Sequence, residues 1–270
     1  MIFLIFLILI SLGATGSLYY FLGLYQQWYW FWVIIVGIPV FFLLGFGLTL
    51  GILLIISKTI NTKKEVLKPK KVARFIVNQV TYVLIMLSGT RIRTHNLDSI
   101  NRKQKYMIVY NHTSNFDPMI IFSRIPKVIC ITKPENFKIP LAGPFVHEAG
   151  YISIDRENDS EGIKSIQRAI DCLNNNYGSI CVAPEGTRSK THELLPFRPG
   201  CFNIAKRANT PILVIGLKNA FKIHENFMKR FTTVDMKVLG VIQPEEVERQ
   251  STAELSQNIH TMYESYLGGE

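Results

Sequence analysis

The first 57 residues of the chain form one uninterrupted apolar and uncharged stretch, and polar segments begin only after it. No Asp, Glu, Lys, Arg or His occurs between residues 1 and 57. A bilayer core about 30 Å thick is crossed by roughly 20 helical residues, so the stretch is long enough for two spans. We expect a transmembrane helical hairpin with spans over residues 1–24 and 28–57, joined by a turn at residues 25–27.

Aromatic residues follow the expected turn and support the hairpin. The belt of aromatic side chains typical of a membrane surface is represented there by Trp28, Tyr29, Trp30 and Trp32. The alternative is a single span, with residues 1–24 lying in the membrane interface. A cleaved signal peptide is disfavoured, because the first residues lack the basic segment that such peptides carry.

Residues 58–74 form a basic flank directly after the second expected span. Seven Lys and Arg residues stand there against one acidic residue, Glu65, and they supply most of the net charge of +10. Basic segments beside a span face the cytoplasm, so we expect the rest of the chain on the cytoplasmic side of the cell membrane. The same cluster attracts anionic lipid, at about 1 kcal/mol per basic residue. No nucleic-acid recognition motif is present, and no nucleic-acid partner is expected.

Beyond the flank, short apolar runs alternate with helical periods. The runs predict buried strands at residues 106–110, 127–131, 151–154, 179–183, 211–217 and 234–241. Helical spacing predicts helices over residues 72–87, 163–173 and 251–266. Alternating strands and helices are typical of an α/β domain, for which we expect a mixed, mostly parallel sheet flanked by helices.

The pattern divides the chain into three parts. We expect a transmembrane segment over residues 1–57, a basic flank with a membrane-proximal helix over residues 58–90, and a cytoplasmic domain over residues 91–270. The cysteines form no Cys-x-x-Cys pair and have no zinc-site spacing, so no metal site is expected. Cys130 and Cys181 fall in apolar runs, which predicts reduced thiols in the core of a cytoplasmic domain.

The segment after the strand predicted at residues 106–110 carries a candidate general base. His112 and Asp117 are five positions apart, about 140° around an ideal helix, so they meet only if the chain turns between them. Pro118 suits the first turn of a helix, with Asp117 as its cap. A histidine oriented by a carboxylate is a general-base pair. The alternative is a purely capping Asp117 beside a structural His112.

The chain lacks a matching nucleophile of its own. Ser114 is only two residues from His112, and no Gly-x-Ser-x-Gly elbow occurs anywhere. The hydroxyl that His112 would deprotonate therefore belongs to a substrate. This indicates direct transfer to a substrate hydroxyl from an activated donor.

Two further stretches carry candidate binding residues. After the strand at residues 179–183, Gly186 allows a close backbone approach, and the planar fork of Arg188 suits a phosphate. The alternative is a polar turn with a surface arginine. The third stretch runs from Lys133 to Arg156. Its basic and apolar residues either accept a phosphorylated lipid or form a solvated helix face.

Together these stretches resemble the glycerolipid acyltransferase family, in particular its bacterial 1-acyl-sn-glycerol-3-phosphate acyltransferase branch. The resemblance covers about residues 72–218. It is carried by four blocks in family order: Asn111, His112 and Asp117; then Phe137-Lys138-Ile139-Pro140, Gly143 and Ile154-Asp155-Arg156; then Glu185-Gly186-Thr187-Arg188 with Leu194 to Gly200; and last Pro211-Ile212.

The resemblance implies a role for each matching residue. His112 would be the general base, and Asp117 would orient it. The acyl acceptor would be bound by Glu185, Gly186, Thr187, Arg188, Lys133 and Arg156, with Arg188 on the phosphate. In the region that selects the acceptor in this family, Ala183 and Asn136 differ from the residues that are common there. The identity of the acceptor is therefore left open.

The implied reaction moves an acyl group from an acyl thioester to the free hydroxyl of lysophosphatidate and gives phosphatidate. No cofactor or metal is expected. The acyl donor, acyl-coenzyme A or acyl-acyl carrier protein, would enter as a co-substrate. Membrane lipids are the other expected partners. Two alternatives stay open: an acceptor such as glycerol 3-phosphate or another lysophospholipid, and a catalytically inactive lipid-binding membrane module.

Overall fold

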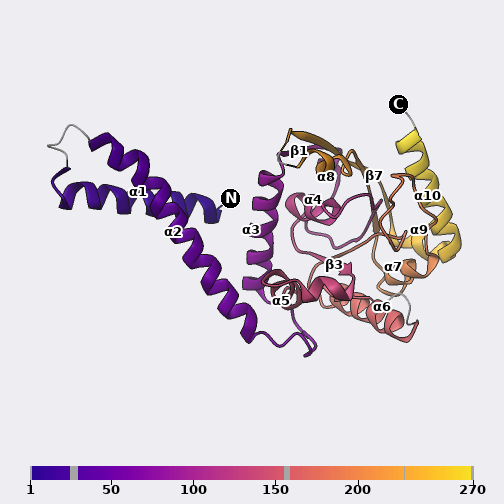
Figure 1. The fold of residues 1–270 in the computed structure, drawn as a ribbon. Helices are drawn as coiled ribbons and strands as arrows, with labels where there is room; N and C mark the ends of the chain where they lie inside the picture. The colour runs from indigo at the N-terminus through magenta and orange to yellow at the C-terminus, as the bar shows by residue number, and fades with distance from the viewer. Residues whose placement is uncertain (1, 25–29, 155–158, 228, 269–270) are drawn as a thin grey trace.

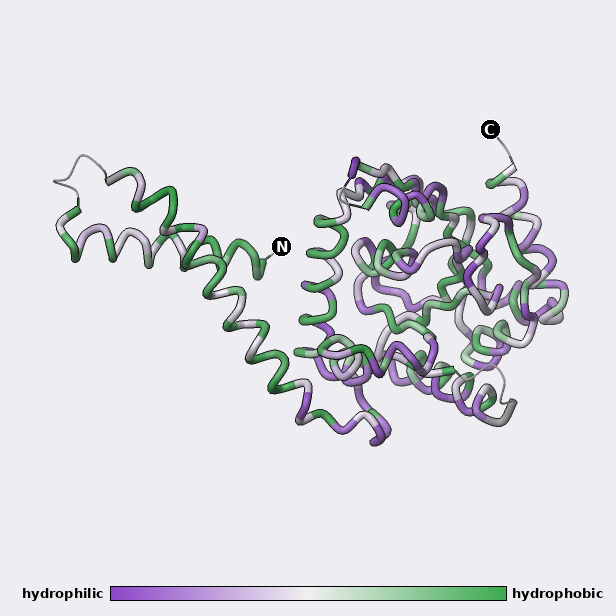
Figure 2. The backbone as a smooth tube through the Cα atoms, in the orientation of Figure 1, coloured by the Kyte–Doolittle hydropathy of each residue, from purple (hydrophilic) through white to green (hydrophobic). Residues whose placement is uncertain are grey.

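The computed structural model describes residues 2–24, 30–154, 159–227 and 229–268. Two long helices project from one side of an α/β domain, and a third helix lies between them and the domain (Figure 1). The projecting helices are hydrophobic along most of their length, whereas the domain alternates hydrophobic and hydrophilic segments (Figure 2). The chain therefore separates into an apolar extension and a water-compatible domain, as its charge pattern predicts.

The extension is an antiparallel hairpin of α1 (Ile2–Phe21) and α2 (Trp30–Thr59). A Cβ built on Gly37 would lie 2.8 Å from Thr15 Cγ2, and one built on Gly45 would lie 3.3 Å from Leu7 Cδ2. The helices thus approach closely where glycine removes a side chain, as in membrane helix pairs. Both are long and apolar enough to cross a bilayer. The predicted hairpin is confirmed, although its predicted turn at residues 25–27 lies outside the described residues.

Helix α3 (Lys71–Leu87) lies against the domain and confirms the helix predicted there. Its buried residues are Ala73, Thr81 and Ile85, whereas Val72 and Phe75 are exposed. One side of α3 therefore packs on the domain, and an apolar side faces away from it. The start of α1 also reaches this helix, because the Phe3 backbone N–H donates to Gln79 Oε1 at 3.3 Å.

The domain is built on a seven-stranded sheet with the order β1-β7-β6-β2-β5-β3-β4. Its strands are β1 (Thr90–His95), β2 (Met107–Tyr110), β3 (Val128–Thr132), β4 (Ile152–Ser153), β5 (Ser179–Val182), β6 (Ile212–Lys218) and β7 (Thr232–Ile242). All neighbours are parallel except β6 and β7. The mixed, mostly parallel sheet is confirmed. Strand β1 was not predicted, because five of the six residues of this edge strand are polar and none of its positions is buried.

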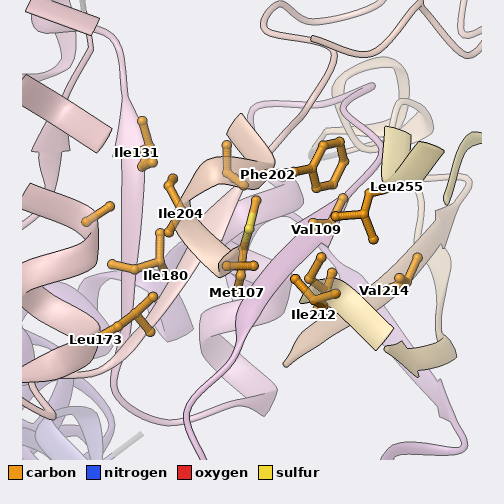
Figure 3. Packing of buried hydrophobic residues seen from close by; sticks show 14 of the residues in the cluster. Met107, Val109, Ile131, Leu173, Ile180, Phe202, Ile204, Ile212, Val214 and Leu255 are labelled. Atoms are coloured by element: carbon orange, nitrogen blue, oxygen red, sulfur yellow. The ribbon is translucent and has the colours of Figure 1, made fainter. Parts of the chain in front are cut away.

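Helices cover both faces of the sheet. Alternate residues of β2 enter different cores, with Met107 and Val109 on one face and Ile108 and Tyr110 on the other. The first core also contains Phe202 and residues of the helices α6 (Asp159–Asn174), α7 (Asn203–Arg207), α9 (Pro244–Arg249) and α10 (Thr252–Gly268) (Figure 3). The second contains residues of α4 (Asp117–Arg124) and α8 (Lys222–Asn226). Helix α5 (Ala142–Glu148) packs with α3 in a third, smaller cluster.

The strand order brings the candidate residues together. Strand β2 lies between β5 and β6, and the three are parallel, so their carboxyl ends share one edge of the sheet. At that edge the side-chain amide of the buried Asn111 takes the place of a backbone partner in the sheet. It accepts a hydrogen bond from the Leu217 N–H at 2.8 Å and donates one to the Leu217 carbonyl at 3.0 Å. This pair holds β2 to β6 at the point where the chain leaves the sheet.

The hairpin contact can be tested with a pair of glycine substitutions. Gly37→Leu forces a side chain into Thr15, and such overpacking costs about 1–3 kcal/mol. Gly47→Leu is the matched control, because no atom lies within 4 Å of a Cβ built there. Both variants gain the same helix propensity, so we expect a lower apparent Tm in detergent for Gly37→Leu alone. Equal Tm values for the two variants would contradict the hairpin packing.

Candidate active site

His112 and Asp117 form a hydrogen-bonded pair in the turn that follows β2. The distance from His112 Nδ1 to Asp117 Oδ2 is 2.9 Å, and the Asp117 side chain is fully buried whereas that of His112 is 19% exposed. The same Oδ2 accepts the backbone N–H groups of Thr113 at 2.8 Å and Ser114 at 2.7 Å. An oxygen that already accepts two bonds is an acceptor for the imidazole as well, so Nδ1 carries the proton and Nε2 is left as the basic nitrogen.

Asp117 does not cap helix α4 as expected. The helix begins at Asp117 itself, Phe116 occupies the N-cap position, and no side-chain cap is made there. The Asp117 carboxylate instead turns back to the amides of Thr113 and Ser114. The expectation of a cap is wrong because the turn before the helix offers these amides, and their bonds aim the carboxylate at His112.

Burial has a strong effect on the Asp117 carboxyl. It raises the pKa of Asp117, while the hydrogen bonds from His112, Ser114 and Thr113 oppose that rise. The second oxygen, Oδ1, has no hydrogen-bond partner among the described residues. A buried carboxylate that is short of partners interacts strongly with a positive charge at His112. An imidazolium at His112 would therefore be stabilised by this carboxylate.

The Glu185 carboxylate accepts hydrogen bonds from two backbone N–H groups, one of which belongs to His112. Glu185 is only 4% exposed. Its Oε1 accepts the His112 N–H at 2.6 Å, and its Oε2 accepts the Leu195 N–H at 3.2 Å. The Ser189 N–H in turn donates to the His112 carbonyl at 2.9 Å. Both carboxylate oxygens thus hold the loops around His112.

The loop after β5 approaches its neighbours closely at Gly186. This residue has φ +74°, and a Cβ built on it would lie 2.8 Å from Arg198 Nε. The Arg198 backbone N–H also donates to the Pro184 carbonyl at 2.8 Å. From the sequence, Arg198 was included only as part of the family block Leu194 to Gly200, and its contact with Gly186 was not predicted. The family block was the one signal that could have found it.

The remaining candidate residues are spread along the same edge of the sheet. Thr187 and Arg188 are exposed, and Arg188 precedes the Ser189 amide that binds the His112 loop. Lys133 is exposed at the end of β3, which β5 separates from β2. Arg156 lies outside the described residues. Within the described ranges, no group of three or more His, Cys, Asp or Glu residues is arranged to hold a metal ion.

Comparison with known proteins assigns the domain that carries this site. Residues 91–218 match the family model described as acyltransferase. The chain carries an acyltransferase domain. This range includes both members of the His112–Asp117 pair and the loop of Gly186 and Arg188, so the family match and the site coincide.

Several relatives share one name, 1-acyl-sn-glycerol-3-phosphate acyltransferase. The relative from Cocos nucifera is 29% identical over 68% of this chain and 60% of its own length. The one from Salmonella typhimurium is 26% identical over 74% of this chain and 81% of its own length. The chain thus spans about 60% of the length of the coconut relative, and only 46% of the one from Saccharomyces cerevisiae.

A solved structure shares the fold of the acyltransferase domain. The crystal structure of the 1-acyl-sn-glycerophosphate (LPA) acyltransferase PlsC from Thermotoga maritima matches with a TM-score of 0.59. The match covers 82% of this chain and 88% of that chain, at 20% sequence identity. The likeness at this identity establishes the fold, and the chemistry rests on the site itself.

The burial of Glu185 predicts a pH effect on the stability of the acyltransferase domain. Burial raises the pKa of Glu185 from 4.5 to about 7. At pH values between these two, Glu185 is ionised in the unfolded chain but still protonated in the folded protein. A rising pH therefore lowers the free energy of unfolding. The full effect is roughly 3 kcal/mol. Relative to Glu185→Gln, which does not titrate, the wild type should lose stability from about pH 5 to about pH 8.

The measurement is the apparent Tm of both proteins at the two pH values. All other titrating groups are common to the pair, so the change in their Tm difference isolates Glu185. Glu193→Gln, in the same loop but exposed, controls for the loss of a carboxylate. A Tm difference between wild type and Glu185→Gln that does not change with pH would contradict the burial of an ionisable Glu185.

Proposed function

We propose that this protein transfers an acyl group from an acyl thioester to the free hydroxyl of lysophosphatidate, giving phosphatidate. The observation that carries the proposal is the His112–Asp117 pair at the carboxyl end of β2, which leaves Nε2 free to act as a base. The acyltransferase match over residues 91–218 and the shared name of the relatives support the reaction and the acceptor.

The proposed reaction is a direct transfer with His112 as general base. Nε2 takes the proton of the acceptor hydroxyl as its oxygen attacks the thioester carbonyl carbon. Asp117 stabilises the imidazolium that forms. The carbon–sulfur bond then breaks, and the departing thiolate takes the proton back from His112. No acyl-enzyme forms, because the nucleophile is the acceptor hydroxyl.

The acceptor phosphate is proposed to lie beside Arg188, whose planar guanidinium binds two phosphate oxygens at once. Lys133 adds positive charge at the same edge of the sheet, and Gly186 and Thr187 line the approach. Arg156, outside the described residues, is proposed to bind the acceptor as well. Glu185 acts as a positioning residue, because its carboxylate holds the His112 backbone. The thioester, either of coenzyme A or of acyl carrier protein, enters as a co-substrate, and we propose no further cofactor.

We propose that the hairpin anchors the enzyme in the cell membrane and that residues 58–270 are cytoplasmic. In this division residues 1–57 are the transmembrane segment, residues 58–90 the basic flank with α3, and residues 91–270 the catalytic domain. The seven basic residues within residues 58–74, from the last turn of α2 to the start of α3, support this orientation. An acceptor in the inner leaflet then reaches the site without leaving the membrane surface.

Substitutions in the base pair test the proposed mechanism. His112→Ala should lower kcat roughly 10²- to 10⁴-fold, the contribution of a positioned base. Asp117→Asn should lose most of the same factor, because a neutral amide stabilises an imidazolium poorly compared with a carboxylate. The measurement is kcat with labelled acyl thioester and lysophosphatidate.

His95 provides the matched control for these variants. It also forms a histidine–aspartate pair, with Nε2 3.2 Å from Asp235 Oδ1, but this pair is exposed on the β1 and β7 edge of the sheet. His95→Ala should keep wild-type kcat. A His112→Ala enzyme with wild-type kcat would exclude His112 as the base.

Arg188 can be tested through the acceptor. Arg188→Ala should raise KM for lysophosphatidate more than KM for the thioester, and Arg188→Lys should also be impaired because an ammonium lacks the bidentate fork. Arg93→Ala, an exposed arginine on β1, controls for a general loss of positive charge. Unchanged acceptor KM in both Arg188 variants would remove Arg188 from the phosphate site.

Cysteine labelling of intact cells tests the orientation. A membrane-impermeant maleimide should label a cysteine at Gln26, in the expected outer turn, and should not label one at Lys63 until the membrane is opened. Labelling of Lys63→Cys from outside would reverse the proposed topology.

A further inference from the structure

A cavity of about 560 Å³ lies where the linker after α2 meets α5 and α6. Lys63 and Lys64 of the linker line it, together with Lys138 from the turn after β3 and with Lys164 and Arg168 of α6. None of His112, Asp117, Glu185 or Arg188 takes part in its lining. The cavity is therefore separate from the candidate active site, and the proposed reaction gives it no role.

The charges around the cavity are unbalanced. Its five Lys and Arg side chains face two carboxylates, Glu65 and Glu161. Glu65 lies 3.4 Å from Arg168, and Glu161 lies 2.8 Å from Lys164. Among the described residues, the other three cations of the cavity, Lys63, Lys64 and Lys138, make no salt bridge. Cations gathered in a recess of low dielectric concentrate a field that attracts anions.

The lining also offers neutral contacts. His147 Nδ1 is buried and has no hydrogen-bond partner among the described residues. Burial lowers the pKa of His147, although a backbone hydrogen bond with Lys64 opposes this, so its ring is neutral near pH 7 and Nδ1 is left to contact a ligand. Phe137, whose ring meets that of His147 edge-on at 5.9 Å, and Ile152 supply apolar surface. A ligand with a phosphate, neutral polar groups and an apolar part matches this lining.

The cavity lies close to the end of the membrane hairpin. Helix α2 ends at Thr59, and Lys63 follows four residues later, within about 14 Å even for an extended chain. The linker is fastened to the domain, because Arg168 Nη2 donates to the Val66 carbonyl at 2.9 Å and Lys70 forms a 2.6 Å ion pair with Glu148. The cationic recess is thus held close to the end of α2, where a membrane-spanning α2 would leave the bilayer.

We propose that this cavity binds the headgroup of an anionic membrane phospholipid, with its phosphate on Lys63, Lys64 and Lys138. The bound lipid bridges the linker of the hairpin and the turn after β3 in the domain, and so fixes the domain at the membrane surface. The site depends on α2 being a membrane span, but it does not depend on the proposed catalytic reaction.

Ligand-induced stabilisation of the purified full chain in neutral detergent tests this site. Short-chain phosphatidylglycerol should raise the apparent Tm by roughly 2–4 °C, because a ligand that binds only the folded state stabilises it. Short-chain phosphatidylcholine at the same concentration should not. Inorganic phosphate and adenosine 3′,5′-bisphosphate, the nucleotide end of coenzyme A, test for a soluble anion instead.

Matched variants locate the effect. Lys63→Gln/Lys138→Gln removes two cavity cations and should abolish the Tm rise. Lys58→Gln/Lys68→Gln removes the same charge outside the cavity lining and should keep it. Arg188→Ala should also keep it, which separates this site from the proposed phosphate site of the enzyme.

Three outcomes would overturn the proposal. One is no Tm rise with phosphatidylglycerol. Another is equal loss in the two lysine double variants, which would reflect general attraction by the basic flank. The last is an equal rise with phosphate or the nucleotide, which would assign the cavity to a soluble anion.

Discussion

One carboxylate oxygen, Asp117 Oδ2, organises the loop on which the catalytic account depends. It accepts the His112 Nδ1–H and two backbone N–H groups, all within 2.9 Å. The two backbone bonds bend residues 113–116 into the turn that brings His112 and Asp117 together. The third bond fixes the tautomer that leaves Nε2 basic. Because the carboxylate is buried, its charge acts on His112 with little screening by water.

The sheet supplies the rigidity that this loop lacks by itself. Three parallel strands end side by side, and a buried polar side chain closes the gap at each junction. Asn111 joins β2 to β6 through Leu217, and Glu185 joins β2 to the loop after β5 through the His112 amide. Where the chain leaves the sheet, buried backbone groups would otherwise lack hydrogen-bond partners. Each of these side chains forms hydrogen bonds with such groups. His112 is thus fixed from both neighbouring strands.

The sequence predicted the elements and contacts that depend on side-chain type. It did not predict the hydrogen bonds whose partners are backbone groups. Apolar runs located six strands, but β1 has an exposed polar face and gave no run. Helices α7, α8 and α9 have five or six residues, too few for a helical period. The His112–Asp117 pair was predicted on the condition that the chain turns between the two residues, and the family blocks supported it. The partners of Glu185 could not be, since any residue at positions 112 and 195 other than proline offers the same N–H group.

The central claim is that His112 activates the acceptor hydroxyl for direct attack on the thioester. Rapid chemical quenching of a single turnover, with acyl-labelled thioester and enzyme in excess, tests it most directly. Without acceptor, the label should stay on the thioester. With lysophosphatidate, it should appear in phosphatidate with no protein-bound label at any time. A protein-bound label that forms without acceptor and passes to lysophosphatidate at the turnover rate would contradict the account.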